Sequence, residues 1–158
     1  MTRSKRLRTL LADAKLLAKQ YYALTGRPLG ITSEVAESEA VRHLRLQLAV
    51  VRQPGYDALG VARGRRPDRV QIKGRRIVGR LNPGSRVGSI DLRKRWDTVL
   101  LVLLDANFEA TAIYRANRLA VRQALRAPGS KARNERGQLS ISKFKSIGQK
   151  VWPKGRDA

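Results

Sequence analysis

Apolar residues recur every three or four positions near the start of the chain, which is the spacing of one helical face. The pattern predicts a helix over residues 4–24, ended by Gly26 and Pro28. Its apolar positions are Leu7, Leu10, Leu11, Ala14, Leu17, Ala18 and Tyr21. This stripe is suited to packing on a sheet or pairing with another chain.

Three further helices are predicted. One begins at Thr32 or Ser33, since either side chain can cap a helix N-terminus, and ends near residue 46. Another covers about 117–126. The last is capped by Ser140 or Ser142, and its apolar residues at near-helical spacing are Ile141, Phe144, Ile147 and Val151.

Between these helices, alternating or continuous apolar runs bounded by Gly and Pro predict five strands. The strands are Leu46–Val51, Tyr56–Val61, Arg69–Lys73, Thr98–Leu104 and Phe108–Tyr114. Residues 98–104 are apolar on both faces, so this strand is expected at the centre of a covered sheet.

The order of elements predicts an α/β fold in which helices flank a mixed β-sheet of about five strands. The 158 residues suit a single domain spanning 1–158. Within it we expect an extra N-terminal helix (1–26), a core (31–116) and a basic, helical C-terminal extension (117–158).

The charge is strongly one-sided, with 34 Lys and Arg against 12 Asp and Glu, a formal net charge of +22. Residues 63–95 carry twelve basic and two acidic side chains, and residues 115–156 carry twelve basic and one acidic. Such repulsion is usually offset by a polyanion, so the two segments predict the walls of a groove that binds nucleic acid.

Several classes of protein are excluded by composition. The chain has no Cys and one His, which argues against disulfides, thiolate metal sites and His-based triads. No apolar run approaches the roughly 20 residues of a membrane span, and no apolar signal-peptide core is present, so a soluble, cytoplasmic protein is expected. The Arg-rich start also fits a transit peptide, but its apolar spacing favours a permanent helix.

Acidic residues are scarce enough to consider one by one. On the second helix, Ala36, Ala40 and Leu44 share a face, and Glu37 falls near its middle, whereas Glu39 is expected to point away. A carboxylate on a buried face is costly unless it meets a cation. The alternative is that Glu37 only complements the helix N-terminus.

The strands place a second carboxylate where an apolar side chain is expected. Asp57 shares a face with Leu59 by strand alternation, and Gln71 and Lys73 share one face of the next strand. The alternative for each is ordinary: a turn-associated Asp, and a Gln and a Lys facing solvent. Occurring together, these residues favour a site.

The order Glu37, then Gly55-Tyr56-Asp57, then Gln71-Ile72-Lys73 resembles the PD-(D/E)xK nuclease superfamily. The resemblance covers about residues 31–116 and implies a restriction-endonuclease-like fold with Mg²⁺- or Mn²⁺-dependent endonuclease activity. The stretch 37–44 is also similar to the first core helix of resolvase-type members. Two departures are Tyr56 for the proline and Gln71 for the usual second acid.

The resemblance also implies a role for each residue. Asp57 is the principal metal ligand, the Gln71 side chain and the Ile72 carbonyl are secondary ligands, and Glu37 binds directly or through water. Lys73 orients or deprotonates the attacking water and offsets developing charge. Gln71 supplies no negative charge, which favours one metal ion over two.

Basic side chains near these residues are expected to hold DNA phosphates, with RNA as a possible second substrate. They are Arg63, Arg65, Arg66, Arg75, Arg76, Arg80, Lys143 and Lys145. Cutting both strands together needs two sites, hence a homodimer. Two alternatives stay open, a ribosome-associated or architectural nucleic-acid-binding protein and a nuclease fold left inactive by Gln71.

Overall fold

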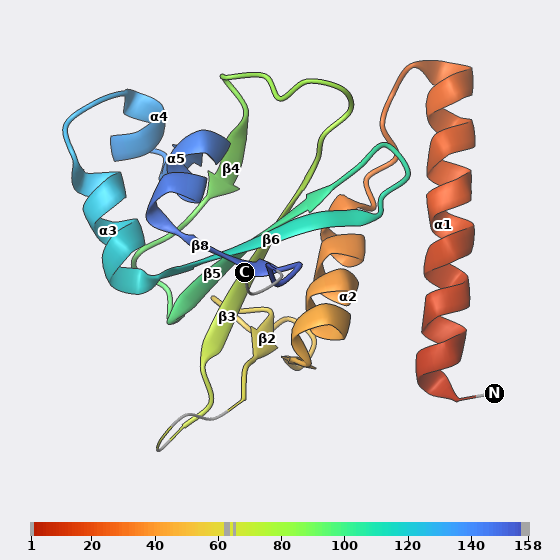
Figure 1. Ribbon diagram of the computed structural model, residues 1–158, viewed down its shortest axis with the longest axis horizontal. Coiled ribbons are helices and arrows are strands. Elements are labelled where there is room, and N and C mark those ends of the chain that lie inside the picture. Colours follow the sequence, from red (N-terminus) through yellow and green to blue (C-terminus); the bar gives the residue numbers. More distant parts are fainter. Residues whose placement is uncertain (1, 62–63, 65, 156–158) are drawn as a thin grey trace.

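The computed structural model describes residues 2–61, 64 and 66–155. A mixed sheet of six strands lies at the centre, with helices and a second, two-stranded sheet around it (Figure 1). The helices are α1 (Arg3–Thr25), α2 (Thr32–Leu44), α3 (Arg118–Arg126), α4 (Lys131–Asn134) and α5 (Ile141–Ile147). The strands are β1 (Gln47–Leu48), β2 (Ala58–Leu59), β3 (Arg69–Arg76), β4 (Arg86–Ser89), β5 (Thr98–Leu104), β6 (Ala110–Asn117), β7 (Gln138–Ser140) and β8 (Gln149–Trp152).

The main sheet has the strand order β1-β2-β3-β5-β6-β8. Strands β3 and β5 run parallel, from Val70 opposite Thr98 to Arg76 opposite Leu104, and every other pair in this sheet is antiparallel. All seven residues of β5 are buried. The predicted central strand is therefore confirmed, since only a strand covered on both faces can bury consecutive side chains.

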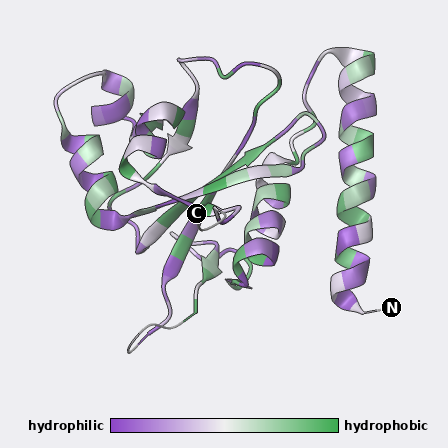
Figure 2. Cartoon of the chain, in the orientation of Figure 1, coloured by the Kyte–Doolittle hydropathy of each residue, from purple (hydrophilic) through white to green (hydrophobic). Residues whose placement is uncertain are grey.

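Two hydrophobic clusters lie on the two faces of this sheet. Val99 and Leu101 of β5 pack with α3, α5 and the β4–β7 sheet, whereas Leu100 and Val102 pack with α2. Hydrophobic residues follow the central strands in Figure 2, and polar ones dominate the loops. Strand alternation thus divides β5 between two cores, and the predicted α/β class is confirmed.

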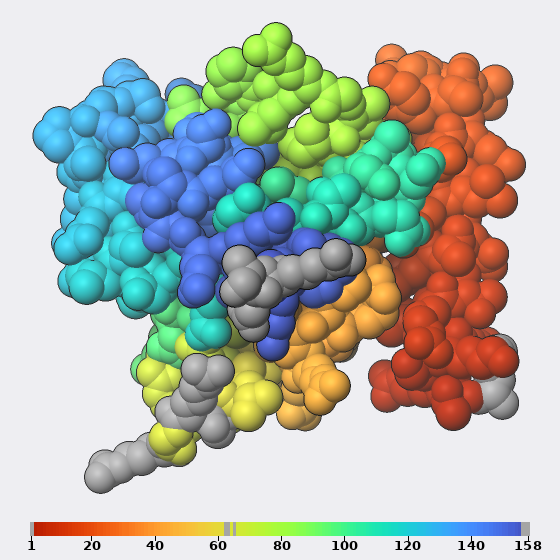
Figure 3. Space-filling view, in the orientation of Figure 1, coloured from red at the N-terminus to blue at the C-terminus, as the bar shows by residue number. Residues whose placement is uncertain are grey.

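Helix α1 contacts the sheet layer through one part of its length. Ala18 is buried, Lys15 forms a 2.8 Å ion pair with Glu109, and Lys19 donates a hydrogen bond to Asn107. Leu11 is partly buried, and the other leucines of the helix are exposed, including Leu10 and Leu24. The helix stands beside the body as a separate column (Figure 3). Among the described residues, none of the helices is both long and apolar enough to cross a membrane.

The predicted boundaries of several elements are corrected by the structure. The strands expected over 46–51 and 56–61 are two-residue strands, because β2 pairs with β3 only at Ala58 and Leu59. No Ser or Thr side chain caps α2; its N-cap is Ile31. The sheet has six strands rather than about five.

The pattern predicts a helical extension after residue 117, but this segment also contains strands. It adds β7, which pairs with β4, and β8, which extends the main sheet next to β6. Val151 therefore lies in β8 and not on the last helix. Gly148 makes this possible, because a Cβ there would lie 2.9 Å from the Arg115 carbonyl oxygen.

Candidate active site

An unpaired stretch of one strand edge is the basis of the site. Strand β2 pairs with β3 only up to Val70, whose carbonyl accepts a 2.8 Å hydrogen bond from the Asp57 backbone N–H. The next N–H on that edge, at Ile72, donates a 2.7 Å hydrogen bond to the Asp57 carboxylate. Because a strand residue directs its N–H and C=O to the same edge, the Ile72 carbonyl faces this position too.

The turn before Asp57 brings a second oxygen to this edge. Gly55 adopts a φ of +89°, and a Cβ there would lie 2.8 Å from the Arg95 carbonyl, so only Gly fits. The Gly55 carbonyl accepts from the Gln71 amide nitrogen at 3.4 Å. The Gln71 Oε1 atom is buried and has no hydrogen-bond partner within the described part of the chain. A buried acceptor without a partner is expensive, so this oxygen is expected to bind a water molecule or a ligand.

Glu37 reaches the same place from α2. The helix lies very close to β3: a Cβ added at Gly74 would be only 2.5 Å from the Cβ of Ala36. Glu37 is half-buried, and burial together with the nearby carboxylates of Asp57 and Glu34 raises its pKa to about 6. Carboxylates crowded in this way favour a bound cation.

Lys73 completes the group. Burial lowers the pKa of its ammonium, and the positive charges of Arg75 and Lys94 lower it further, while the carboxylate of Asp57 acts in the opposite direction. Asp57, at the edge of β3, is therefore close to both Glu37 and Lys73, since its charge acts on the pKa of each. Gln71 and Ile72 lie on the same strand beside them.

The predicted face of α2 is partly wrong. Val35 and Glu39 are buried with Ala36 and Ala40, so the helix is rotated from the predicted orientation. Glu39 does not point away: it accepts hydrogen bonds from Arg42 at 2.9 Å and is 3.3 Å from a His43 ring nitrogen. These two partners offset its desolvation.

The oxygen donors fit a hard divalent cation. Two carboxylates, an amide oxygen without a partner and a backbone carbonyl are the ligand types that Mg²⁺ prefers. Within the part of the chain that the structure describes, no group of three or more His, Cys, Asp and Glu side chains is placed to hold a metal ion. Here only two of the four proposed donors are acidic side chains.

One cation that the sequence did not single out, Lys94, also lies near Lys73. Its loop is held by Trp96, whose indole N–H donates 2.9 Å to the Asp91 carbonyl. The Arg118 guanidinium donates to the carbonyls of Lys94 and Trp96 and stacks 4.5 Å from the Trp96 ring. Lys94 is one of three adjacent basic residues, and nothing in their spacing distinguishes it.

Some of the predicted phosphate-binding residues lie close to this group. Arg75 neighbours Lys73 and donates to the Arg86 carbonyl at 2.6 Å, which fixes its guanidinium. Gly88 leaves room for it, since a Cβ there would meet the guanidinium at 2.9 Å. Arg80 and Lys143 are exposed.

Others contact protein groups elsewhere in the fold. Arg66 forms a bidentate ion pair with Asp97 at 2.7 and 2.9 Å. Arg76 donates to the Ala106 carbonyl and lies 4.4 Å from the Phe108 ring, on the opposite face of β3 from Lys73. Lys145 lies over the Tyr114 ring. Arg63 and Arg65 lie outside the described residues.

The site thus combines two close carboxylates, a buried amide oxygen without a partner and a desolvated lysine at an open strand edge. This set can bind a divalent cation and present an ammonium group beside it. No protein-family model and no curated protein matches the sequence.

Proposed function

We propose that the protein is a metal-dependent endonuclease that hydrolyses phosphodiester bonds in DNA, with a restriction-endonuclease-like core. One observation carries the proposal: the charge of Asp57 acts on both Glu37 and Lys73, and the nearby Gln71 has a buried Oε1 atom with no hydrogen-bond partner among the described residues. A protein that only bound nucleic acid would gain nothing from carboxylates near the phosphates. The order of these residues along the chain also resembles the superfamily pattern, with Gln71 in place of the usual second acid.

Asp57, Glu37, the Gln71 side chain and the Ile72 carbonyl would hold Mg²⁺ or Mn²⁺. When bound, the cation supplies Lewis acidity toward a phosphate oxygen. The hydrogen bond from the Ile72 N–H fixes one Asp57 oxygen and leaves the other free to bind. Lys73 orients the attacking water and offsets charge on the phosphate, and its lowered pKa brings proton transfer closer to neutral pH.

The basic residues near this edge supply affinity for the backbone of DNA. The positive charges of Arg75 and Lys94 act on Lys73, so they would also attract a phosphate bound near Lys73. Their contacts are independent of base sequence. We expect binding that weakens steeply with salt.

A non-catalytic nucleic-acid-binding role is the second candidate. The observation that favours it is Gln71, which gives the site one negative charge fewer than an acidic residue there would. An inactive nuclease fold would retain salt-sensitive binding and lose the response to metal.

Purified protein incubated with supercoiled plasmid, branched DNA and RNA, with Mg²⁺, Mn²⁺ or a chelator, tests the proposal. We expect DNA cleavage that the chelator abolishes. Asp57→Asn and Lys73→Ala should each lower the rate at least 100-fold and retain DNA binding. Asp13→Asn and Lys5→Ala remove one negative and one positive charge at exposed positions of α1, and both variants should cleave DNA at the wild-type rate. Failure to cut any substrate with either metal would refute the enzymatic proposal.

A further inference from the structure

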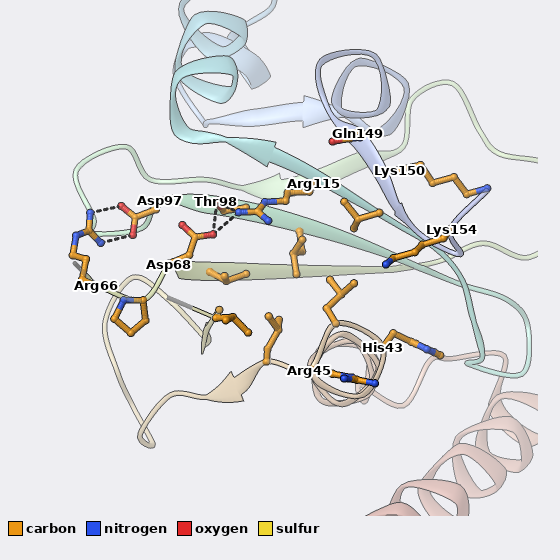
Figure 4. Close-up of a pocket in the computed structure, with 18 residues that line it drawn as sticks. His43, Arg45, Arg66, Asp68, Asp97, Thr98, Arg115, Gln149, Lys150 and Lys154 are labelled. Atoms are coloured by element: carbon orange, nitrogen blue, oxygen red, sulfur yellow. Dashed lines mark hydrogen bonds and ion pairs between the residues drawn. The ribbon is translucent and has the colours of Figure 1, made fainter. Parts of the chain in front are cut away.

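A large hollow lies on the face of the sheet opposite the Gln71 and Lys73 side chains. A hollow of about 1090 Å³ is bordered by the end of α2, by residues 60, 61 and 66–68, and by parts of β5, β6 and β8 (Figure 4). Small-molecule sites in proteins usually measure about 300–1,000 Å³. The hollow is therefore large enough for a complete small ligand or for a short piece of a polymer.

The hollow does not belong to the candidate active site. Its floor includes Val70 and Leu100, which pack with α2, whereas Gln71 and Lys73 alternate to the opposite face of β3. A ligand in the hollow would be separated from Lys73 by the thickness of the sheet. The two sites can be tested separately.

The lining is positively charged. Five Lys and Arg side chains border it against two carboxylates: Arg45, Arg66, Arg115, Lys150 and Lys154 against Asp68 and Asp97. In Figure 4 the Lys154 side chain extends back over the hollow, while Lys150 points away from it. An anionic group is the chemistry that this lining favours.

Both carboxylates are already occupied by arginines. Asp97 binds Arg66 and Arg69, and these contacts hold the pKa of its carboxyl well below the usual range. Asp68 binds Arg115 at 2.7 Å and the Thr98 hydroxyl at 2.8 Å. The carboxylates therefore fix guanidinium groups at the rim instead of forming a site for a cation.

The floor is apolar. It is formed by Leu44, Leu46, Val70, Leu100 and Val151. A charged rim above an apolar floor suits a ligand that carries an anionic group on a flat, weakly polar body. A nucleotide has this combination, with a phosphate for the rim and a base and sugar for the floor.

We propose that this hollow binds a nucleotide, with the phosphate at the cationic rim, which includes Lys154 and Arg45, and the base against the apolar floor. The nucleotide is either free or part of a nucleic-acid strand, and both sources present the same chemistry. The net charge of +22 favours nucleic-acid components over other phosphorylated molecules. The proposal does not depend on catalysis or on a metal ion.

Methyl NMR of the wild-type protein in chelator and 150 mM salt tests it directly. The probes are deoxyadenosine monophosphate, deoxyadenosine, inorganic phosphate and a deoxyadenosine hexanucleotide. We expect the monophosphate or the hexanucleotide to shift the floor methyl signals and to bind at least tenfold more tightly than deoxyadenosine or phosphate. Shifts with the hexanucleotide alone would identify a strand as the source, and shifts with the monophosphate would identify the free nucleotide.

A charge-matched pair of variants separates the hollow from general electrostatics. The double variant Arg45→Gln, Lys154→Gln should bind the monophosphate or the hexanucleotide at least fivefold more weakly. The double variant Lys5→Gln, Arg8→Gln, on exposed positions of α1, should change this affinity less than twofold. Equal weakening in both pairs would overturn the proposal. So would an absence of shifts in the wild-type floor methyls, or phosphate binding as tightly as the nucleotide.

Discussion

The Ile72 backbone N–H donates a 2.7 Å hydrogen bond to the Asp57 carboxylate, which ties the unpaired edge of β3 to the turn before β2. Asp57→Ala removes both the charge and the acceptor, whereas Asp57→Asn removes the charge and keeps an oxygen acceptor. We expect the Ala variant to be less stable than the Asn variant by about 1 kcal/mol. Urea denaturation measures the difference, and equal stability would mean that this bond contributes nothing.

Gln71 offers a direct test of the metal site. Gln71→Glu places a third carboxylate beside Asp57 and Glu37 and removes the donor to the Gly55 carbonyl. Without metal, we expect a loss of about 1–2 kcal/mol in unfolding free energy from like-charge repulsion. Millimolar Mg²⁺ should recover the loss and raise the melting temperature more than in the wild type. A variant with no larger response to Mg²⁺ would contradict the assignment of Gln71 as a ligand.

Glu37 makes stability depend on pH. Its pKa in the folded protein is about 6, above the ordinary value of 4.5, so ionising Glu37 lowers the stability of the fold. This loss of stability grows as the pH rises from 4.5 to 6 and reaches its full size above pH 6. Glu37→Gln should therefore be more stable than the wild type by about 1 kcal/mol at pH 7.5. This is half of the free energy that the pKa difference corresponds to, because the carboxyl is only half-buried and solvent screens it.

At pH 4 the gain from Glu37→Gln should disappear, because the wild-type carboxyl is then protonated in both states. Metal-dependent cleavage by the wild type should fall as the pH drops through about 6, since the protonated carboxyl is a poor ligand. Denaturation curves at three pH values and rates across the same range provide the measurement. A gain that persists at pH 4 would point to packing and not to charge.

The close approach of α2 to β3 depends on Gly74. In Gly74→Ala the new Cβ would lie 2.5 Å from the Cβ of Ala36 and 3.1 Å from the Thr32 carbonyl oxygen, so the helix must move. We expect a loss of about 1–3 kcal/mol in stability and weaker metal binding, because Glu37 moves with the helix. Gly30→Ala, where a Cβ meets nothing within 4 Å, is the control and should not destabilise the protein.

Asp97 holds residues 66–69 against the start of β5. Asp97→Asn should cost about 1 kcal/mol at pH 7, because two guanidinium groups lose a charged partner that solvent partly screens. The folded pKa of Asp97 is depressed, so its contribution is present above the unfolded pKa of about 3.9 and declines as the pH falls below it. Asp13→Asn is the matched exposed control in the same denaturation series, and a cost independent of pH would argue against charge as its origin.

Local patterns in the sequence were enough to identify the elements with the strongest periodicity. The apolar run of residues 98–104 predicted the central strand, and the three-four spacing predicted α1 to within one residue at each end. Strand alternation likewise separated Lys73 from Ile72. These features depend on neighbours only a few positions apart, so they are visible without the fold.

Contacts between distant segments decided the rest. Glu39 is buried with partners only three and four residues away, Arg42 and His43. The long-range contact is the stacking of His43 3.8 Å from Trp152 of β8, and helical periodicity cannot report a contact across more than 100 residues. Tertiary packing also made β8 a strand, brought Lys94 to Lys73 and left the Gln71 oxygen buried without a partner. The sequence by itself determined which residues could carry the chemistry, whereas the tertiary structure decided which of them share one desolvated space, because burial and charge proximity arise only when the chain is packed.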